Sequence, residues 1–175
     1  MTLHERASRV RLLVLDVDGV LTDGSVLLHA DGSESKTFHI RDGSALVWAQ
    51  RVGLTVALLS ARTSAATAHR AAQLSIPIVA QGVGNKLTAY EHMTREAGVE
   101  DTAVAYMGDD LLDLPVLARV GLAAAPADAA PEVRACAHWI SGLNGGRGAV
   151  RELVELVLQS QGRWDEVVRH YLPQA

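Results

Sequence analysis

Residues 10–24 read VRLLVLDVDGVLTDG, an apolar run followed by two aspartates and a glycine. Residues 10–17 have the length of one strand, and a continuous apolar run of this length is typical of a strand buried on both faces of a parallel sheet. Further short apolar segments alternate with helical stretches, at residues 54–59, 78–80, 102–107 and 121–124. This alternation predicts an α/β fold with a doubly wound, Rossmann-like parallel sheet.

The segments between these strands carry helix and hairpin signals. Helices are expected at residues 44–51, 64–74, 85–97, 111–120 and 148–161, and the tail at 163–172 is compatible with a helix. Asp42 and Ser64 are expected to cap the first two of these helices. Residues 25–40 alternate around Asp31-Gly32 and predict a β-hairpin flap. We therefore expect one domain over residues 8–172, with a hairpin insertion at about 25–40 and a C-terminal tail at about 162–175.

Composition narrows the class of protein. Of 175 residues, 49% are hydrophobic and 4% aromatic, which favours helices packed on a parallel sheet over an all-β sandwich. The 16 basic and 20 acidic residues give a net charge of −4, so we expect no nucleic-acid partner. Apolar runs stay far below the ~20 residues of a membrane helix, so no membrane partner is expected. The single cysteine, Cys136, cannot form an internal disulfide, which favours a cytoplasmic location.

Polar residues of complementary type follow four successive strands. Because ligands of such sheets bind beyond the carboxyl ends of the strands, we expect these residues to meet at one edge. They are Asp16 and Asp18, Ser60 with Arg62, Lys86 behind the glycines Gly82 and Gly84, and the group Asp109, Asp110 and Asp113. Carboxylates so close repel one another unless a cation lies among them, and an oxygen-rich site with water access suits Mg²⁺. With a second cation from Lys86 and a hydroxyl from Ser60, the pattern predicts a phosphate site.

Each signal also has a purely structural alternative. An Asp-x-Asp after a strand is more often a turn or a helix cap, Ser60 alone is a cap, and Lys86 alone is a solvated helix residue. The glycine-rich residues 145–148 are equally a loop before the last helix or a place where a neighbour or ligand approaches the backbone. The order of the four groups at four successive strand ends favours the functional interpretation.

The four groups resemble the ordered motifs of the haloacid dehalogenase-like phosphatases. The matching motifs lie at residues 16–24, at Ser60, at Lys86 and at residues 108–113. The resemblance implies that Asp16 attacks phosphorus and forms an aspartyl-phosphate. It implies that Asp18 is the general acid and then the general base, and that Ser60 and Lys86 bind the transferring phosphate.

The same resemblance implies a metal site. Mg²⁺ would be held by the carboxylates of Asp16 and Asp109 and by the backbone carbonyl of Asp18. Asp110 and Asp113 would orient waters and the loop around the ion.

Flanking motifs narrow the resemblance to a small, capless subfamily that hydrolyses 3-deoxy-D-manno-octulosonate 8-phosphate. These motifs are Arg41-Asp42-Gly43, Gln81-Gly82 before Asn85-Lys86, and residues 145–152. The resemblance implies a 2-keto-3-deoxy sugar acid phosphate as substrate, in lipopolysaccharide precursor synthesis. It also implies that the hairpin packs into a homotetramer whose neighbouring subunits wall each active site. The implied substrate-binding residues are Asp18, His39, Ile40, Arg41, Asp42, Gly43, Arg62, Arg70 and Lys86.

Two positions depart from the pattern of that subfamily. Val47 stands where an arginine is expected, and His39 replaces a small amide. A related nonulosonate 9-phosphate or another sugar phosphate therefore stays open as substrate, although Arg62 favours the eight-carbon compound because the nine-carbon enzymes tend to carry an acidic residue there. An alternative of another class is a non-catalytic oligomerisation domain of the same fold, against which the complete set of motif aspartates and lysine argues.

Overall fold

The sheet is built around β1 (Leu12–Leu15), a strand in which every residue is buried. The computed structural model describes residues 1–172. Its main sheet has six strands in the order β5-β4-β1-β6-β7-β8, and every neighbouring pair is parallel. The other strands are β4 (Thr55–Leu59), β5 (Ile78–Ala80), β6 (Val104–Met107), β7 (Leu122–Ala125) and β8 (Trp139–Ile140). The predicted α/β class and its doubly wound parallel sheet are confirmed.

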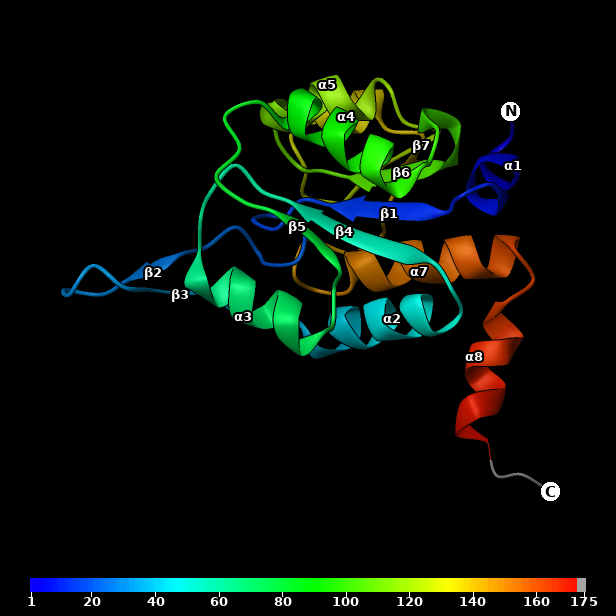
Figure 1. Ribbon diagram of the computed structural model, residues 1–175, viewed down its shortest axis with the longest axis horizontal. Coiled ribbons are helices and arrows are strands. Elements are labelled where there is room, and N and C mark those ends of the chain that lie inside the picture. The colour runs from blue at the N-terminus through cyan, green and yellow to red at the C-terminus, as the bar shows by residue number, and fades with distance from the viewer. Residues whose placement is uncertain (173–175) are drawn as a thin grey trace.

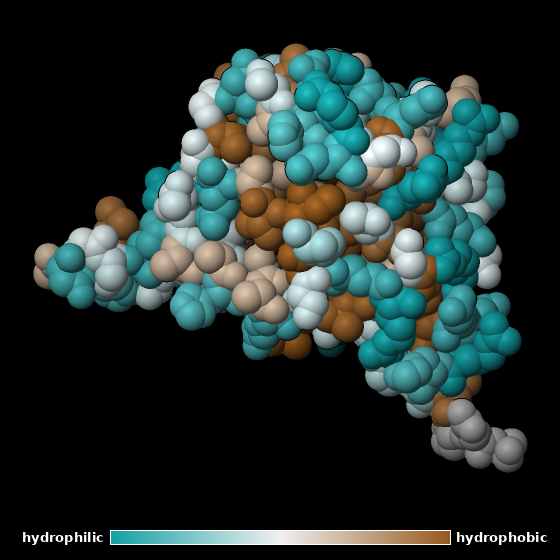
Figure 2. All heavy atoms as spheres, viewed as in Figure 1, coloured by the Kyte–Doolittle hydropathy of each residue, from teal (hydrophilic) through white to brown (hydrophobic). Residues whose placement is uncertain are grey.

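Helices cover both faces of the sheet (Figure 1). Alternate residues of β1 point to opposite faces, so Leu13 and Leu15 join one hydrophobic cluster while Leu12 and Val14 join the other. The first cluster is closed mainly by α1 (Leu3–Ser8), α2 (Ile40–Arg51), α3 (Ala65–Gln73), α7 (Ala149–Ser160) and α8 (Trp164–Tyr171). The second is closed by α4 (Lys86–Ala97), α5 (Leu114–Leu117) and α6 (Pro131–Cys136). The edge strand β5 leaves Val79 exposed, and Figure 2 shows brown apolar surface there, between α4 and α3.

The expected flap is a small antiparallel hairpin that projects from the body (Figure 1). It consists of β2 (Leu27–Leu28) and β3 (Glu34–Ser35), two residues each. Both leucines of β2 are exposed. A ribbon this short has little stability of its own and depends on contacts at its base.

The structure corrects several element boundaries. α2 begins at Ile40 rather than at 44, so Asp42 lies inside its first turn and does not cap it. The helix expected at 111–120 is a 3₁₀ turn, η2 (Leu111–Asp113), followed by the short α5, with Pro115 in its first turn, where a missing N–H costs least. A second 3₁₀ turn, η1 (Asp101–Ala103), precedes β6, and α1, α6 and β8 were not expected. The cap expected of Ser64 is present, with Ser64 Oγ accepting from Thr67 N–H, and Gly98 ends α4 in a left-handed conformation.

The last helix of the described residues, α8, lies within the tail expected at 162–175, and residues 173–175 of that tail lie outside the described part. The longest helices of residues 1–172 have 12 residues, and none is long and apolar enough to cross a bilayer.

Candidate active site

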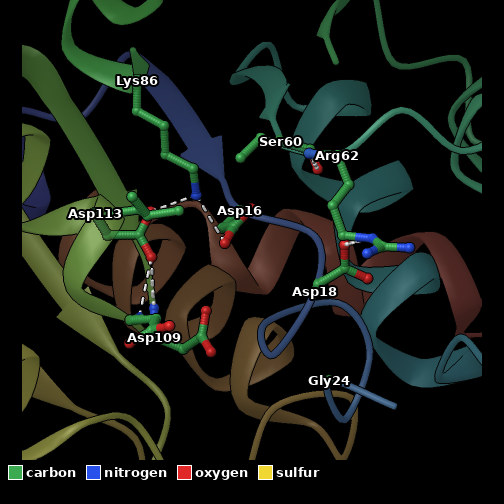
Figure 3. Close-up of a pocket in the computed structure, with 11 residues that line it drawn as sticks. Asp16, Asp18, Gly24, Ser60, Arg62, Lys86, Asp109 and Asp113 are labelled. Atoms are coloured by element: carbon green, nitrogen blue, oxygen red, sulfur yellow. Dashed lines mark hydrogen bonds and ion pairs between the residues drawn. The ribbon is translucent and has the colours of Figure 1, made fainter. Parts of the chain in front are cut away.

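A cavity of about 270 Å³ opens at the carboxyl ends of β1, β4 and β6. Figure 3 shows side chains from four separate stretches of the chain converging on it. Its lining includes Asp16, Asp18, Gly24, Ser60, Arg62, Lys86, Asp109, Asp110 and Asp113. The residues expected to meet at one sheet edge do meet there.

Lys86 ties two carboxylates together at the floor of the cavity. It is the first residue of α4, which Asn85 caps by accepting from Thr88 N–H. Its Nζ lies 2.8 Å from Asp16 Oδ2 and 2.6 Å from Asp113 Oδ1 (Figure 3). Burial alone would lower the pKa of Lys86, but the carboxylates of Asp16 and Asp113 outweigh it and raise that pKa. The lysine is therefore a fixed positive charge directed at Asp16.

Asp113 is completely buried, and all of its lone pairs face donors. Its Oδ2 accepts from the backbone N–H groups of Asp109 and Asp110, at 2.9 and 3.2 Å. Its Oδ1 accepts from Lys86 and from the hydroxyl of Tyr106, a β6 residue whose pKa is raised well above its usual value by burial and by the Asp113 charge. Asp113 thus holds both the lysine and the loop after β6. Tyr106 was missed, although a phenol inside an apolar strand is a signal that a buried partner exists.

Asp109 lies close to Asp16, and one of its carboxylate oxygens has no hydrogen-bond partner in the described part of the chain. Its Oδ1 is buried and has no hydrogen-bond donor among residues 1–172. A Cβ on Gly19, where φ is +85°, would lie 2.0 Å from Asp109 Oδ2, so only glycine lets the loop after β1 approach this carboxylate. Oxygens of Asp16, Asp109 and Asp113 all lie within 4.8 Å of one another.

The electrostatics of this cluster fit a divalent cation. Burial raises the pKa of Asp16 to about 6, with the Asp113 charge adding to the rise and Lys86 opposing it. Burial, followed by the charges of Asp16 and Asp113, raises the pKa of Asp109 to about 8. Buried carboxylates that resist ionisation, one of them with an unpaired oxygen, are an oxygen donor set suited to Mg²⁺. Because the oxygens of Asp113 are already taken by four donors, Asp16 and Asp109 are the carboxylates open to an ion.

Above the floor, one wall of the cavity is formed by Asp18 and Arg62. In the loop after β4, Arg62 N–H donates to Ser60 Oγ at 3.2 Å. The Arg62 side chain contacts Asp18 Oδ2 at 3.7 Å and Glu34 Oε2 at 2.9 Å. Asp18 also meets Lys36 of the hairpin. Glu34 and Lys36 were missed, because their contacts join the hairpin to loops that are distant in the sequence, and no local pattern predicts such contacts.

The glycine-rich segment 145–148 packs against the backbone of the loop after β1. A Cβ on Gly145 would lie 1.8 Å from the carbonyl oxygen of Gly19. Gly146 N–H donates to the carbonyl of Val20 at 2.9 Å. Close backbone packing against the loop that carries Asp16 and Asp18 therefore accounts for these two glycines.

The remaining predicted substrate-binding residues lie outside this cavity in the single chain. Ile40 is exposed, and Arg41 follows it in the first turn of α2. Asp42 and His39 contact each other, with Nδ1 and Oδ2 3.4 Å apart, and Arg70 packs against Gly43 and over the Phe38 ring. Of the predicted set, Asp18, Arg62 and Lys86 line the cavity and the other six do not, and substrate binding by all nine stays a prediction.

Comparison with known proteins defines the family. Residues 55–153 match the family model of the haloacid dehalogenase-like hydrolases. The 3-deoxy-D-manno-octulosonate 8-phosphate phosphatase KdsC of Escherichia coli (strain K12) is 42% identical over 161 residues, which cover 92% of this chain and 86% of that protein. The chain belongs to the haloacid dehalogenase-like hydrolases.

Solved structures of this family agree with the fold throughout. The 3-deoxy-D-manno-octulosonate 8-phosphate phosphatase of Moraxella catarrhalis, in complex with a magnesium ion, a phosphate ion and KDO, has a TM-score of 0.95 at 34% identity and covers 97% of this chain and 98% of its own. The Yersinia pestis phosphatase of the same name has a TM-score of 0.92 at 39% identity, covering 93% and 88%.

Proposed function

We propose that this chain is a Mg²⁺-dependent phosphatase that removes the phosphate of 3-deoxy-D-manno-octulosonate 8-phosphate, in lipopolysaccharide precursor synthesis. The observation that carries the proposal is the convergence of Asp16, Lys86 and Asp109 on one cavity, with Asp18 at its other wall. The identity of 42% with KdsC over most of both chains supports the substrate.

Asp16 and Asp109, with the backbone carbonyl of Asp18, would hold the ion, while Asp113 keeps Lys86 and the loop of Asp109 in place. When bound, Mg²⁺ neutralises negative charge on the carboxylates and on the phosphate, which is the main demand of phosphoryl transfer. Asp110 lines the cavity and caps η2, and we keep for it the role of orienting the loop and the waters around the ion.

Asp16 is the nucleophile of the proposed reaction. As a bond forms between its carboxylate oxygen and phosphorus, the bond from phosphorus to the sugar oxygen breaks, and that oxygen takes a proton from Asp18. A water then gives its proton to Asp18 and attacks phosphorus, which frees phosphate and restores Asp16. Lys86 and Ser60 stabilise the charge on the phosphate oxygens through both steps.

Recognition of the sugar acid rests on cations near the cavity. Arg62 lines it and presents a planar guanidinium, which binds carboxylates bidentately. We extend the proposed binding set to His39, Ile40, Arg41, Asp42, Gly43 and Arg70, with His39 and Val47 as the positions where this chain departs from its subfamily.

Phosphate release tests the proposal directly. Purified protein is assayed with Mg²⁺ against the octulosonate 8-phosphate, a nonulosonate 9-phosphate and common sugar phosphates, each with an EDTA control. We expect Mg²⁺-dependent release with preference for the eight-carbon ester. Preference for the nine-carbon ester would reassign the substrate, and no release from any ester would favour the non-catalytic oligomerisation domain.

We also propose a homotetramer working in the cytoplasm. The exposed side chains of Leu27 and Leu28 on the projecting hairpin support assembly, because exposed apolar ribbons mark protein contacts. In such an assembly, the six predicted binding residues that lie outside the cavity of their own chain would reach the active site of a neighbouring subunit. Sedimentation equilibrium tests this, and a catalytically competent monomer would contradict it.

A further inference from the structure

The sequence contains only two lysines, Lys36 and Lys86, among 16 basic Lys and Arg residues. Each of them contacts one of the two aspartates that follow β1. Lys86 contacts Asp16, as described above, and Lys36 Nζ lies 2.5 Å from Asp18 Oδ1. The second pair has no role in the function proposed so far.

Lys36 lies directly after β3, at the base of the hairpin, and its side chain is fully buried although the hairpin itself is exposed. Burying an ammonium group is costly unless anions surround it. Two carboxylates do so here: Asp18 at 2.5 Å, which accepts its hydrogen bond, and Glu34 Oε1 at 3.9 Å. Lys36 is therefore held where it is by the charge of Asp18.

Four charged groups close a ring at this wall of the cavity. Lys36 and Arg62 alternate with Asp18 and Glu34, and Arg62 binds Glu34 Oε2 at 2.9 Å. In this ring Asp18 Oδ1 is fixed by Lys36. Asp18 Oδ2 is buried without a hydrogen-bond donor among residues 1–172, and Arg62 Nε stands 3.7 Å from it.

We propose that Lys36 is a positioning residue for the acid and base chemistry of Asp18. By holding Oδ1, it leaves Oδ2 as the oxygen that carries the proton to the leaving group and later takes one from water. The inference rests on the proposed phosphatase function, and it adds a residue of the hairpin to the reaction. General acid catalysis is worth roughly 10²–10⁴ in rate and depends on sub-ångström placement of the proton donor.

The nature of the leaving group separates a positioning role from a structural one. A sugar alkoxide leaves slowly without a proton, whereas p-nitrophenolate leaves as an anion. Loss of the positioned acid should therefore slow the first turnover of the octulosonate 8-phosphate and spare the first turnover of p-nitrophenyl phosphate. Water activation follows in both cases, so steady-state turnover of p-nitrophenyl phosphate should also fall.

The experiment compares wild type with Lys36→Met, which keeps the length of the side chain and removes its charge. Rapid-mixing kinetics with Mg²⁺ and excess enzyme gives the first turnover of each ester. We expect Lys36→Met to slow the first turnover of the sugar ester on the order of 10- to 100-fold and to change the first release of p-nitrophenolate by less than about 3-fold. With p-nitrophenyl phosphate in excess over enzyme instead, a burst of p-nitrophenolate should precede a slow steady state. Lys36→Arg, which restores the cation, should recover most of the loss.

A double mutant tests whether the effect passes through Asp18. In an Asp18→Asn background, Lys36→Met should cause no further loss on the sugar ester. Equal loss on both esters, or a full effect of Lys36→Met in the Asp18→Asn background, would overturn the proposal and leave Lys36 as an anchor of the hairpin.

Controls separate this test from folding and from the proposed function. Arg119→Met removes a cation that binds Glu91 and Asp101 away from the cavity, and it should match wild type on both esters. Circular dichroism checks that each variant folds, and Lys36→Gln serves as a second neutral variant. A wild-type enzyme without a Mg²⁺-dependent first turnover on either ester would overturn the proposed function and this inference with it, whereas an active wild type with uniform loss in Lys36→Met overturns the inference alone.

Discussion

The floor of the cavity and its hairpin wall hold their aspartates in different ways. At the floor, Asp16 meets Lys86 of α4, and Lys86 in turn meets the buried Asp113, which also accepts a hydrogen bond from Tyr106 of β6. At the wall, Asp18 meets Lys36 at the base of a hairpin whose strands have two residues each, and Arg62 from the loop after β4. The floor is determined by the core of one chain, whereas the wall depends on four charges and a short ribbon. We therefore expect changes at the floor to remove the chemistry, and changes at the wall to alter acid placement and substrate choice.

Asp16→Asn should give the largest effect at the floor. An amide is a poor nucleophile for phosphorus, so turnover should fall below about 0.1% of wild type. The fold should remain, because asparagine has the shape of aspartate. The substitution also removes a negative charge that burial disfavours. Phosphate release with Mg²⁺ and circular dichroism measure the two properties. More than about 1% residual turnover would show that another group attacks phosphorus.

Lys86→Met should have the next largest effect on turnover. Removing a preorganised cation from a charge-stabilising site costs about 10²–10³ in kcat. It also leaves Asp16 and Asp113 buried together without their shared counterion, so the free energy of unfolding should fall by about 3 kcal/mol. Stopped assays and chemical denaturation measure both. If the variant lost stability but kept wild-type kcat, the lysine would serve the fold alone.

Mg²⁺ and pH should act together on the floor. The pKa of Asp109 is about 8 in the folded chain and lies near 3.8 when unperturbed, so between these values the folded chain keeps a proton that the unfolded chain has lost. Without metal, stability should therefore fall as pH rises through this window, and the loss should be complete above about pH 8. Since the ion must displace this proton, Mg²⁺ should raise the Tm more at pH 8.5 than at pH 6, by on the order of 5–10 °C.

Thermal melting of the wild type and of Asp109→Asn, with Mg²⁺ or with EDTA, tests this coupling. Asp109→Asn should melt with much less dependence on pH in EDTA and should respond weakly to Mg²⁺. A Mg²⁺ response that is equal at both pH values would place the ion away from Asp109.

The sequence was sufficient for the polar residues that follow the strands and insufficient for Tyr106 and for the hairpin side of the wall, and the reason is geometric. Parallel strands bring their carboxyl ends to one edge, so residues placed after strands in the sequence meet regardless of the distance between them along the chain. That rule located Asp16, Ser60, Lys86 and Asp109. The bond from Tyr106 to Asp113 follows from no such rule, because a phenol inside an apolar strand signals a buried partner but does not identify it.

The contact between Lys36 and Asp18 depends on where the base of the hairpin meets the loop after β1. Two-residue strands carry too weak an alternation to fix which side chains face inward. The start of α2 was misplaced for a related reason. Asp42 looks like a cap for its own helix, and the structure uses it to cap another one.

Asp42 offers the smallest but most discriminating test. Its Oδ2 accepts from Gly148 N–H at 3.1 Å and its Oδ1 from Arg151 N–H at 2.9 Å, so it caps α7 from α2. Asp42→Ala would leave both N–H donors without an acceptor. The free energy of unfolding should then fall by about 2 kcal/mol and the Tm by roughly 4–8 °C. Asp42→Asn keeps one acceptor oxygen and should lose about half as much.

If capping is the whole role of Asp42, calorimetry should show these losses while the KM for the octulosonate 8-phosphate stays within about 2-fold of wild type in both variants. The predicted role in substrate binding demands the reverse pattern. A raised KM for the sugar ester with an unchanged KM for p-nitrophenyl phosphate would mean that Asp42 also reaches a bound sugar acid. Because Asp42 is only 1% exposed and lies outside the cavity of its own chain, such a result would require the wall to close further around the substrate than one subunit does.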